Sequence, residues 1–256
     1  MTPISDAFWW LNRYFDGLAP SKVLLGNDRR NEILDKLDQT QGAEDTLRAY
    51  VHDHRRNARI DYGIQGNFLL FDRAYFYRNF LKCLVAAHYL GGCFPNLKSV
   101  DRVIDVGSGI GTFSVACQVM YTFPQAKYLL VDQHPLQIDL AKRLAEWLRF
   151  ENFEFQVGDV FQEFHRRGFL IASYWLCGNH RESVLNQTEK RLRYILKDGA
   201  VIIDYRKNIE EFAAKILPFD PSVTQLEIRA PLTENVERYV GVRSLNVHML
   251  VIDPLE

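Results

Sequence analysis

The chain has 256 residues, and 47% of them are hydrophobic, which is enough apolar surface for a complete folded core. Its 31 lysines and arginines balance 32 aspartates and glutamates. The formal net charge of -1 excludes the strong overall positive field that concentrates proteins on nucleic acid. This balance favours a small-molecule partner, and it leaves open a local basic face that binds nucleic acid.

The four cysteines form no CxxC pair and have no histidine at zinc-finger spacing, so we expect free thiols and no metal site. These residues are Cys83, Cys93, Cys117 and Cys177. An apolar run at residues 7–11 is too short for a signal sequence or a membrane span. The sequence therefore predicts a cytoplasmic protein that is not inserted in a membrane.

Residues 1–95 are rich in aromatic and charged side chains, and we expect a helical region that packs on the domain after it. One periodic apolar stripe predicts a helix that ends at Gly91 and Gly92. The stripe consists of Tyr77, Leu81, Leu84, Val85 and His88.

From residue 100 onward, short runs rich in Val, Ile and Leu alternate with amphipathic segments, which is typical of a parallel sheet with crossover helices. The predicted strands are 100–106, 126–132, 153–157, 169–174 and 200–205. The clearest crossover helices have apolar stripes over residues 136–148 and 185–196. The sequence thus predicts a doubly wound α/β domain over residues 96–256.

The last part of the chain predicts one more helix and two extended segments. The helix covers residues 209–217 and ends at Pro218. Extended stretches at 224–229 and 245–252 are expected to close the sheet as an antiparallel pair.

A buried strand runs directly into three glycines, Gly107, Gly109 and Gly111, and then into a helix that begins near Thr112. We interpret these glycines as a tight turn that brings the backbone into contact with a ligand, leaving no room for a Cβ. The helix behind them offers unpaired N–H groups to a negatively charged ligand. Thr112 stands where the dinucleotide pattern requires its third glycine, which disfavours a nicotinamide or flavin enzyme.

The turn is preceded by Asp105, and the resulting Asp-x-Gly-x-Gly-x-Gly pattern resembles the first motif of class I S-adenosylmethionine-dependent methyltransferases. This resemblance implies a Rossmann-like fold, with the glycine turn beneath the amino-acid part of the cofactor. It also implies that Asp105 helps to hold the ammonium group of the cofactor, directly or through water.

The same resemblance assigns an acidic residue to the end of the second strand, where it accepts hydrogen bonds from both ribose hydroxyls. Asp132 occupies this place, about 20 residues after the glycines. Gln133 follows it and is expected beside the adenine, with Pro135 at the first position of the next helix. A helix N-cap is the alternative role for Asp132.

A third carboxylate, Asp159, follows the third predicted strand, where the resemblance implies a contact with the adenine amino group and a backbone contact from Val160. An N-cap is an equally good interpretation of Asp159. The complete predicted cofactor site is Asp105, Gly107, Ser108, Gly109, Gly111, Asp132, Gln133, Gly158, Asp159, Val160 and Tyr174.

The acceptor is expected beyond the fourth strand, where the chain lacks both the Asn/Asp-Pro-Pro-Tyr/Phe motif of exocyclic-amine methyltransferases and a Pro-Cys pair. Tyr174, Asn179 and His180 are the candidate pocket residues. His180 is suited to act as a general base, and a loop or cap histidine is the alternative. Residues 1–95 are expected to supply a lid and part of the acceptor pocket.

These observations predict an S-adenosylmethionine-dependent methyltransferase that transfers a methyl group directly to an unidentified acceptor, with a small molecule favoured. One alternative is transfer of the aminocarboxypropyl group of the same cofactor, as in nicotianamine-synthase-like proteins. A catalytically silent cofactor-binding scaffold is another. A third is an RNA methyltransferase that binds phosphates through Arg48, Arg55, Arg56 and Arg59.

Overall fold

The computed structural model describes residues 65–159, 167–176, 198–216, 223–231 and 243–252. Several predictions lie outside these residues, namely Val160, Asn179, His180, the helix at 185–196 and the four arginines at 48–59. The described elements are α4 (Gln65–Cys93), the short 3-10 helix η1 (Pro95–Ser99), β1 (Arg102–Val106), α5 (Thr112–Val119), β2 (Lys127–Asp132), α6 (Pro135–Leu148), β3 (Phe153–Val157), β4 (Phe169–Ser173), β5 (Ala200–Asp204), α10 (Arg206–Ile216), β6 (Val223–Pro231) and β7 (Ser244–Ile252).

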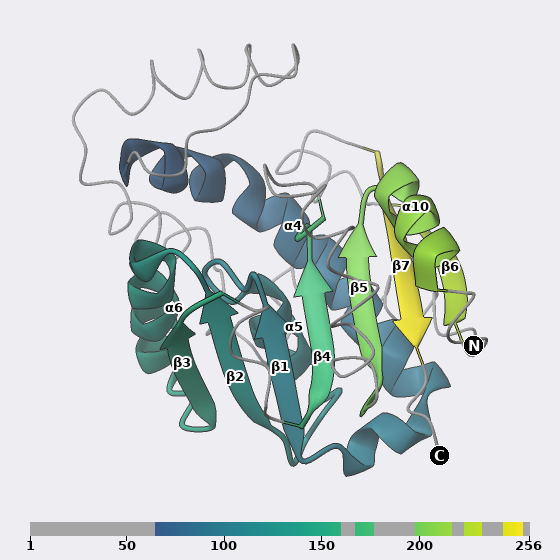
Figure 1. Ribbon diagram of the computed structural model, residues 1–256, viewed down its shortest axis with the longest axis horizontal. Coiled ribbons are helices and arrows are strands. Elements are labelled where there is room, and N and C mark those ends of the chain that lie inside the picture. Colours follow the sequence, from purple (N-terminus) through teal and green to yellow (C-terminus); the bar gives the residue numbers. More distant parts are fainter. Residues whose placement is uncertain (1–64, 160–166, 177–197, 217–222, 232–242, 253–256) are drawn as a thin grey trace.

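The seven strands form one sheet in the order β3-β2-β1-β4-β5-β7-β6 (Figure 1). Strands β1 to β5 are parallel, whereas β7 runs antiparallel to both of its neighbours, β5 and β6. The predicted fold class, a mostly parallel doubly wound sheet closed by an antiparallel pair, is confirmed. The first strand begins two residues later than predicted, because η1 and its cap residue Val100 occupy the preceding segment.

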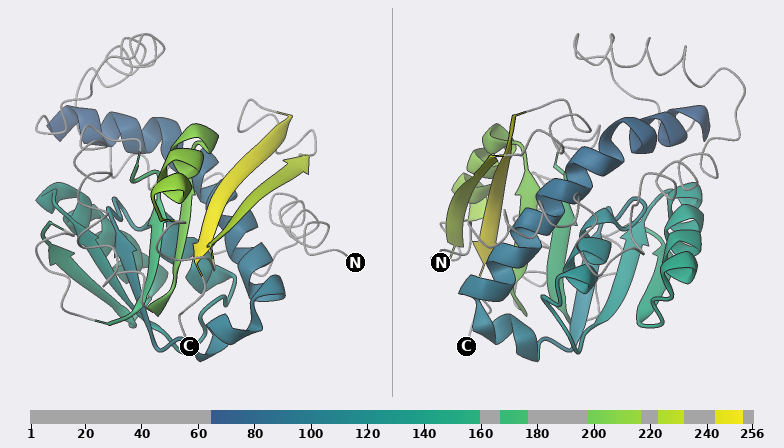
Figure 2. Two further views of the ribbon diagram at one scale, coloured as in Figure 1. Left: turned by 45° about the vertical axis from the view of Figure 1, so that its right-hand side comes forward. Right: turned by 180° about the vertical axis from the view of Figure 1, so that it is seen from behind.

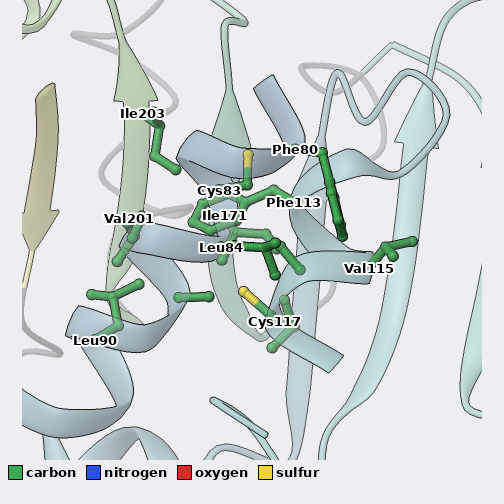
Figure 3. Packing of buried hydrophobic residues seen from close by; sticks show 14 of the residues in the cluster. Phe80, Cys83, Leu84, Leu90, Phe113, Val115, Cys117, Ile171, Val201 and Ile203 are labelled. Carbon is green, nitrogen blue, oxygen red and sulfur yellow. The ribbon is translucent and has the colours of Figure 1, made fainter. Parts of the chain in front are cut away.

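Side chains alternate between the two faces of each strand, so the apolar runs build a separate core on each face. In β1, Val103 belongs to the core beneath α4, α5 and α6, whereas Ile104 and Val106 belong to the core beneath α10. Figure 2 shows α4 crossing the sheet diagonally when it is seen from behind. Figure 3 shows side chains of α4 and α5 interleaving with those of β4 and β5.

Helix α4 is longer than its apolar stripe predicted. It continues through the two glycines to Cys93, so the prediction that Gly91 and Gly92 end the helix was wrong. Phe94 leaves helical geometry with φ -125° and ψ 77°, as expected for a residue that precedes a proline, here Pro95. The predicted domain boundary near residue 95 stays a prediction. Among the described residues, no helix is long and apolar enough to span a bilayer.

Candidate functional site

The carboxyl ends of the five parallel strands meet at one edge of the sheet, which is the upper edge in Figure 1. The strand order reverses between β1 and β4, because the chain runs outward from β1 to β3 and then returns to β4. In open α/β sheets, ligands bind outside the carboxyl ends at this reversal point. The glycine turn after β1 lies at this point.

The three glycines of the turn have positive φ angles, 58° at Gly107, 54° at Gly109 and 81° at Gly111. A Cβ added to Gly107 would lie 2.7 Å from Cδ1 of Trp175, and one added to Gly111 would lie 2.6 Å from Cδ2 of Leu130. At these two positions, therefore, it is protein packing that leaves no room for a side chain. Gly109 has ordinary space around it and is a glycine for its backbone conformation.

Asp132 ends β2 with a side chain that is only 8% exposed. Its Oδ2 accepts a hydrogen bond from the backbone N–H of Gly109 at 3.0 Å, and its Oδ1 accepts one from the N–H of His134 at 2.9 Å. Burial raises the pKa of this carboxyl, and the two N–H donors oppose that shift. The carboxylate therefore joins the glycine turn to the end of β2, with lone pairs left for a ligand.

Helix α6 begins at Pro135, as predicted, and His134 occupies the N-cap position. The alternative role of Asp132 as the N-cap residue is therefore wrong. The backbone O of Asp132 also accepts the N–H of Gly158 at 3.0 Å, which brings the end of β3 beside it.

Asp105 points away from solvent, toward helix α5, and is only 1% exposed. Its Oδ2 accepts hydrogen bonds from the hydroxyl of Ser114 at 2.7 Å and from the Ser114 backbone N–H at 3.2 Å. Gly111, the N-cap residue of α5, has no side chain that could cap the helix. Asp105, which lies in β1, accepts the Ser114 N–H in its place. Burial raises the pKa of Asp105 to about 7, and its Oδ1 has no hydrogen-bond partner among the described residues.

The remaining predicted cofactor residues of the described chain lie along the same edge. Ser108 is buried, and its N–H donates to the carbonyl of Val131 at 3.1 Å. Gln133 is exposed, with Nε2 3.1 Å from Nε2 of His134. Asp159 is half-buried and lies two residues beyond the end of β3. Their roles toward a cofactor stay predictions.

At the predicted acceptor side, β4 ends one residue before its predicted end, because Tyr174 adopts a left-handed conformation with φ 56°. Its backbone N–H donates to the carbonyl of Ile203 in β5 at 2.8 Å. The ring of Tyr174 meets the ring of Tyr205 edge-on, with centroids 5.5 Å apart and an interplanar angle of 64°. Nζ of Lys82, from α4, lies 5.4 Å from the centroid of the Tyr174 ring.

Sequence reasoning missed Asp204, the last residue of β5, which is only 2% exposed. Its Oδ2 accepts the N–H of Leu176 at 2.9 Å, and its Oδ1 accepts the N–H of Tyr205 and the Nδ2–H of Asn208, each at 2.7 Å. One carboxylate thus fixes the chain after both β4 and β5. An acidic residue that ends an otherwise apolar strand was the available signal.

Residues 97–217 match a protein family described as a methyltransferase domain. The match covers just under half of the chain. It agrees with the predicted methyltransferase superfamily and with the predicted enzyme class. No curated protein matches the chain.

Solved structures of methyltransferases are similar to this chain, and one of them reaches a TM-score of 0.50. The plantazolicin methyltransferase BpumL, in complex with SAH, is 13% identical with a TM-score of 0.50, over 88% of this chain and 100% of its own. The N-terminal domain of human METTL16, also in complex with SAH, is 12% identical with a TM-score of 0.49, over 69% and 71%. Precorrin-6y C5,15-methyltransferase from Geobacter metallireducens GS-15 is 9% identical with a TM-score of 0.46, over 64% and 86%.

Proposed function

We propose that the methyltransferase domain binds S-adenosylmethionine across the glycine turn and Asp132, and transfers its methyl group directly to a small-molecule acceptor. The observation that carries this proposal is the Asp132 carboxylate, which Gly109 and His134 hold in place at the end of β2. Two vicinal ribose hydroxyls are donors, and an oriented, acceptor-only carboxylate suits them. The likeness of the fold to SAH-bound methyltransferases supports the same cofactor.

The residues around the glycine turn fit the charges of this cofactor. Its amino-acid part carries an ammonium group, and the buried Oδ1 of Asp105 has no hydrogen-bond partner among the described residues. A cation beside this carboxyl lowers its pKa from about 7 and favours the ionised form. We assign Asp159 and Gly158, which follow β3, to the adenine, together with Gln133, which follows β2 at the same edge of the sheet.

When bound, S-adenosylmethionine supplies a methyl group on a sulfonium that leaves as a neutral thioether, so the chemistry belongs to the cofactor. The protein has to bind, align the acceptor and exclude water. The glycine turn and Asp132 orient the cofactor side. The chain after β4, from Tyr174 onward, forms the acceptor side, and we assign no general base within the described residues.

A small-molecule acceptor is favoured over RNA by the net charge of -1. Free, buried thiols at Cys83 and Cys117 are consistent with a reducing, cytoplasmic environment.

The N-terminal region contributes Lys82 to the acceptor side, which supports the proposed role of this region in the acceptor pocket.

The proposal is tested with S-adenosylmethionine labelled either in the methyl group or in the aminocarboxypropyl group. The protein is incubated with the small-molecule fraction of a cell extract and, separately, with RNA. We expect methyl label in a small molecule and release of S-adenosylhomocysteine. Release of methylthioadenosine would indicate aminocarboxypropyl transfer, label in RNA would indicate a nucleic-acid enzyme, and no transfer with either source would support a silent scaffold.

A further inference from the structure

Two tyrosine rings stand at the carboxyl ends of neighbouring strands. Ser173 and Ile203 are paired in register in β4 and β5, and Tyr174 and Tyr205 follow these strands. Their rings meet edge to face at 5.5 Å, a favourable aromatic geometry. Tyr205 is 48% exposed, which is high for a large side chain with a mostly apolar ring. An aromatic surface thus faces solvent at the ligand-binding edge of the sheet.

The turn that contains Tyr174 has a strained backbone, and hydrogen bonds hold it in place. A φ of 56° is rare for a bulky residue that is not glycine, and such strain persists only where the surrounding structure enforces it. The Tyr174 N–H is bound by the carbonyl of Ile203, and the Leu176 N–H is bound by the buried carboxylate of Asp204. Hydrogen bonds to β5 therefore hold the Tyr174 turn in one conformation.

The same turn brings the aromatic surface beside the glycine turn. Trp175, between the two pinned residues, packs so closely on Gly107 that its Cδ1 lies 2.7 Å from the place of a Cβ. Tyr174 is therefore one residue from a side chain that touches the cofactor turn. Asp204 also accepts the N–H of Tyr205, so a single buried carboxylate holds Tyr205 and Leu176, which lies two residues after Tyr174. The two rings are preorganised next to the proposed methyl donor.

We infer that Tyr174 and Tyr205 form the acceptor-binding surface, and that the acceptor is a planar aromatic ring bearing an acidic group. A flat ring can stack on the partly exposed side chain of Tyr205 while Tyr174 borders it. The ammonium of Lys82, 5.4 Å from the Tyr174 centroid, favours an anionic ring over a cationic one. This inference rests on the proposed function.

The transfer to such an acceptor balances without another reactant. A lone pair on a ring substituent, an oxygen, nitrogen or sulfur, forms a bond to the methyl carbon while the carbon–sulfur bond breaks. The electrons of that bond stay on sulfur, which becomes a neutral thioether, and the proton of the substituent passes to solvent.

Matched pairs of compounds test the planarity requirement. The wild-type protein is given methyl-labelled S-adenosylmethionine with 4-hydroxybenzoate, 4-aminobenzoate or 4-mercaptobenzoate, and with the cyclohexane carboxylate that corresponds to each. We expect label in at least one benzoate and none in its saturated counterpart. Equal labelling of the two members of a pair, label in none of the six compounds, or label in added RNA instead would overturn the inference.

Variants assign the effect to the aromatic surface. Tyr205→Leu keeps apolar bulk but removes the ring, and it should lower kcat/KM for the labelled benzoate about tenfold, mostly through KM. Tyr205→Phe should restore it. Tyr121→Leu is the control, because Tyr121 is 74% exposed and lies in the loop before β2, at the opposite edge of the sheet. An unchanged KM in Tyr205→Leu would overturn the inference.

Calorimetry separates this outcome from failure of the proposed function. S-adenosylhomocysteine should bind the wild type and Tyr205→Leu with affinities within about twofold, since the ring is not assigned to the cofactor. If the cofactor product binds but the benzoates do not react, only the acceptor class is wrong. If the cofactor product does not bind at all, the proposed function itself fails.

Discussion

The glycine turn after β1 and the tyrosine pair after β4 and β5 lie at the same edge of the sheet, yet they are built in different ways. On the cofactor side, backbone atoms form most of the surface. Three glycines have positive φ angles, and the Gly109 N–H donates a hydrogen bond to Asp132. On the acceptor side, side chains predominate: two aromatic rings contact each other, and the Asp204 carboxylate binds the backbone N–H groups of Tyr205 and Leu176.

This difference shows what each half of the site can tolerate. A surface built from backbone suits a ligand that never varies, such as a cofactor. Its geometry depends on glycines, and a side chain at these positions would distort it. A surface built from side chains can change its specificity by substitution while the scaffold stays intact. The comparison predicts that changes on the cofactor side impair folding and binding of the cofactor, whereas changes on the acceptor side alter selectivity.

The largest expected effect concerns Asp105, whose pKa rises from 3.8 to about 7 on burial. Because the folded state holds the proton more tightly, this residue stabilises the fold below pH 4, and that stabilisation is lost as the pH rises through 7. Asp105→Asn should remove this pH dependence. Between pH 4 and pH 8, its free energy of unfolding should rise by up to about 4 kcal/mol relative to that of the wild type. Urea unfolding of both proteins at pH 4 and at pH 8 measures this difference.

Asp101→Asn is the matched control, since Asp101 is an exposed carboxylate four residues earlier. This variant keeps Asp105 and should therefore keep the pH dependence of the wild type. The interpretation of Asp105 as a buried, proton-binding cap of α5 would be contradicted if both variants followed the pH dependence of wild type.

Next in size is the effect of a methyl group in the glycine turn. Gly111→Ala should lower the free energy of unfolding by about 3 kcal/mol, because it combines left-handed strain with a clash against Leu130. Gly109→Ala has the strain without the clash and should cost about 1 kcal/mol. Denaturant unfolding of the two variants compares them, and equal losses would show that packing on Leu130 is not what excludes a side chain.

On the acceptor side, Asp204→Asn should cost about 2 kcal/mol, because an amide cannot accept hydrogen bonds from all three of its N–H partners. The loss should appear in the unfolding free energy and in acceptor KM, while the affinity for S-adenosylhomocysteine stays within about twofold. A large loss of affinity for S-adenosylhomocysteine in this variant would contradict the claim that Asp204 acts on the acceptor side alone.

The parts of the fold that local patterns predict were recovered well. Apolar runs marked all five parallel strands, and Pro135 marked the start of α6, because burial on both faces and a fixed φ leave direct traces in sequence. The helix end at Gly91 and Gly92 was wrong, because glycine tolerates a helix when packing supports it, whereas Pro95 sets the actual limit.

The parts of the site that depend on contacts between distant segments could not be predicted from the sequence. The resemblance to class I methyltransferases and the position after a predicted strand pointed to Asp132. The contact of Trp175 with Gly107 and the role of Asp204, in contrast, join residues that are far apart in the chain. Asp105 was expected beside a ligand, and the structure shows its bonds to Ser114 of the same βα unit. The orientation of a carboxylate is set by packing, which the strand pattern does not reveal.

The central claim is that Asp132 holds the cofactor, and calorimetry with S-adenosylhomocysteine tests it most directly. The wild type should bind, and Asp132→Ala should bind about a hundredfold more weakly, because two charge-assisted hydrogen bonds to the ribose are lost. Asp139→Ala, which removes an exposed carboxylate from α6, should bind as the wild type does. Wild-type affinity in Asp132→Ala, or no binding by the wild type, would contradict the assignment of this edge as the cofactor site.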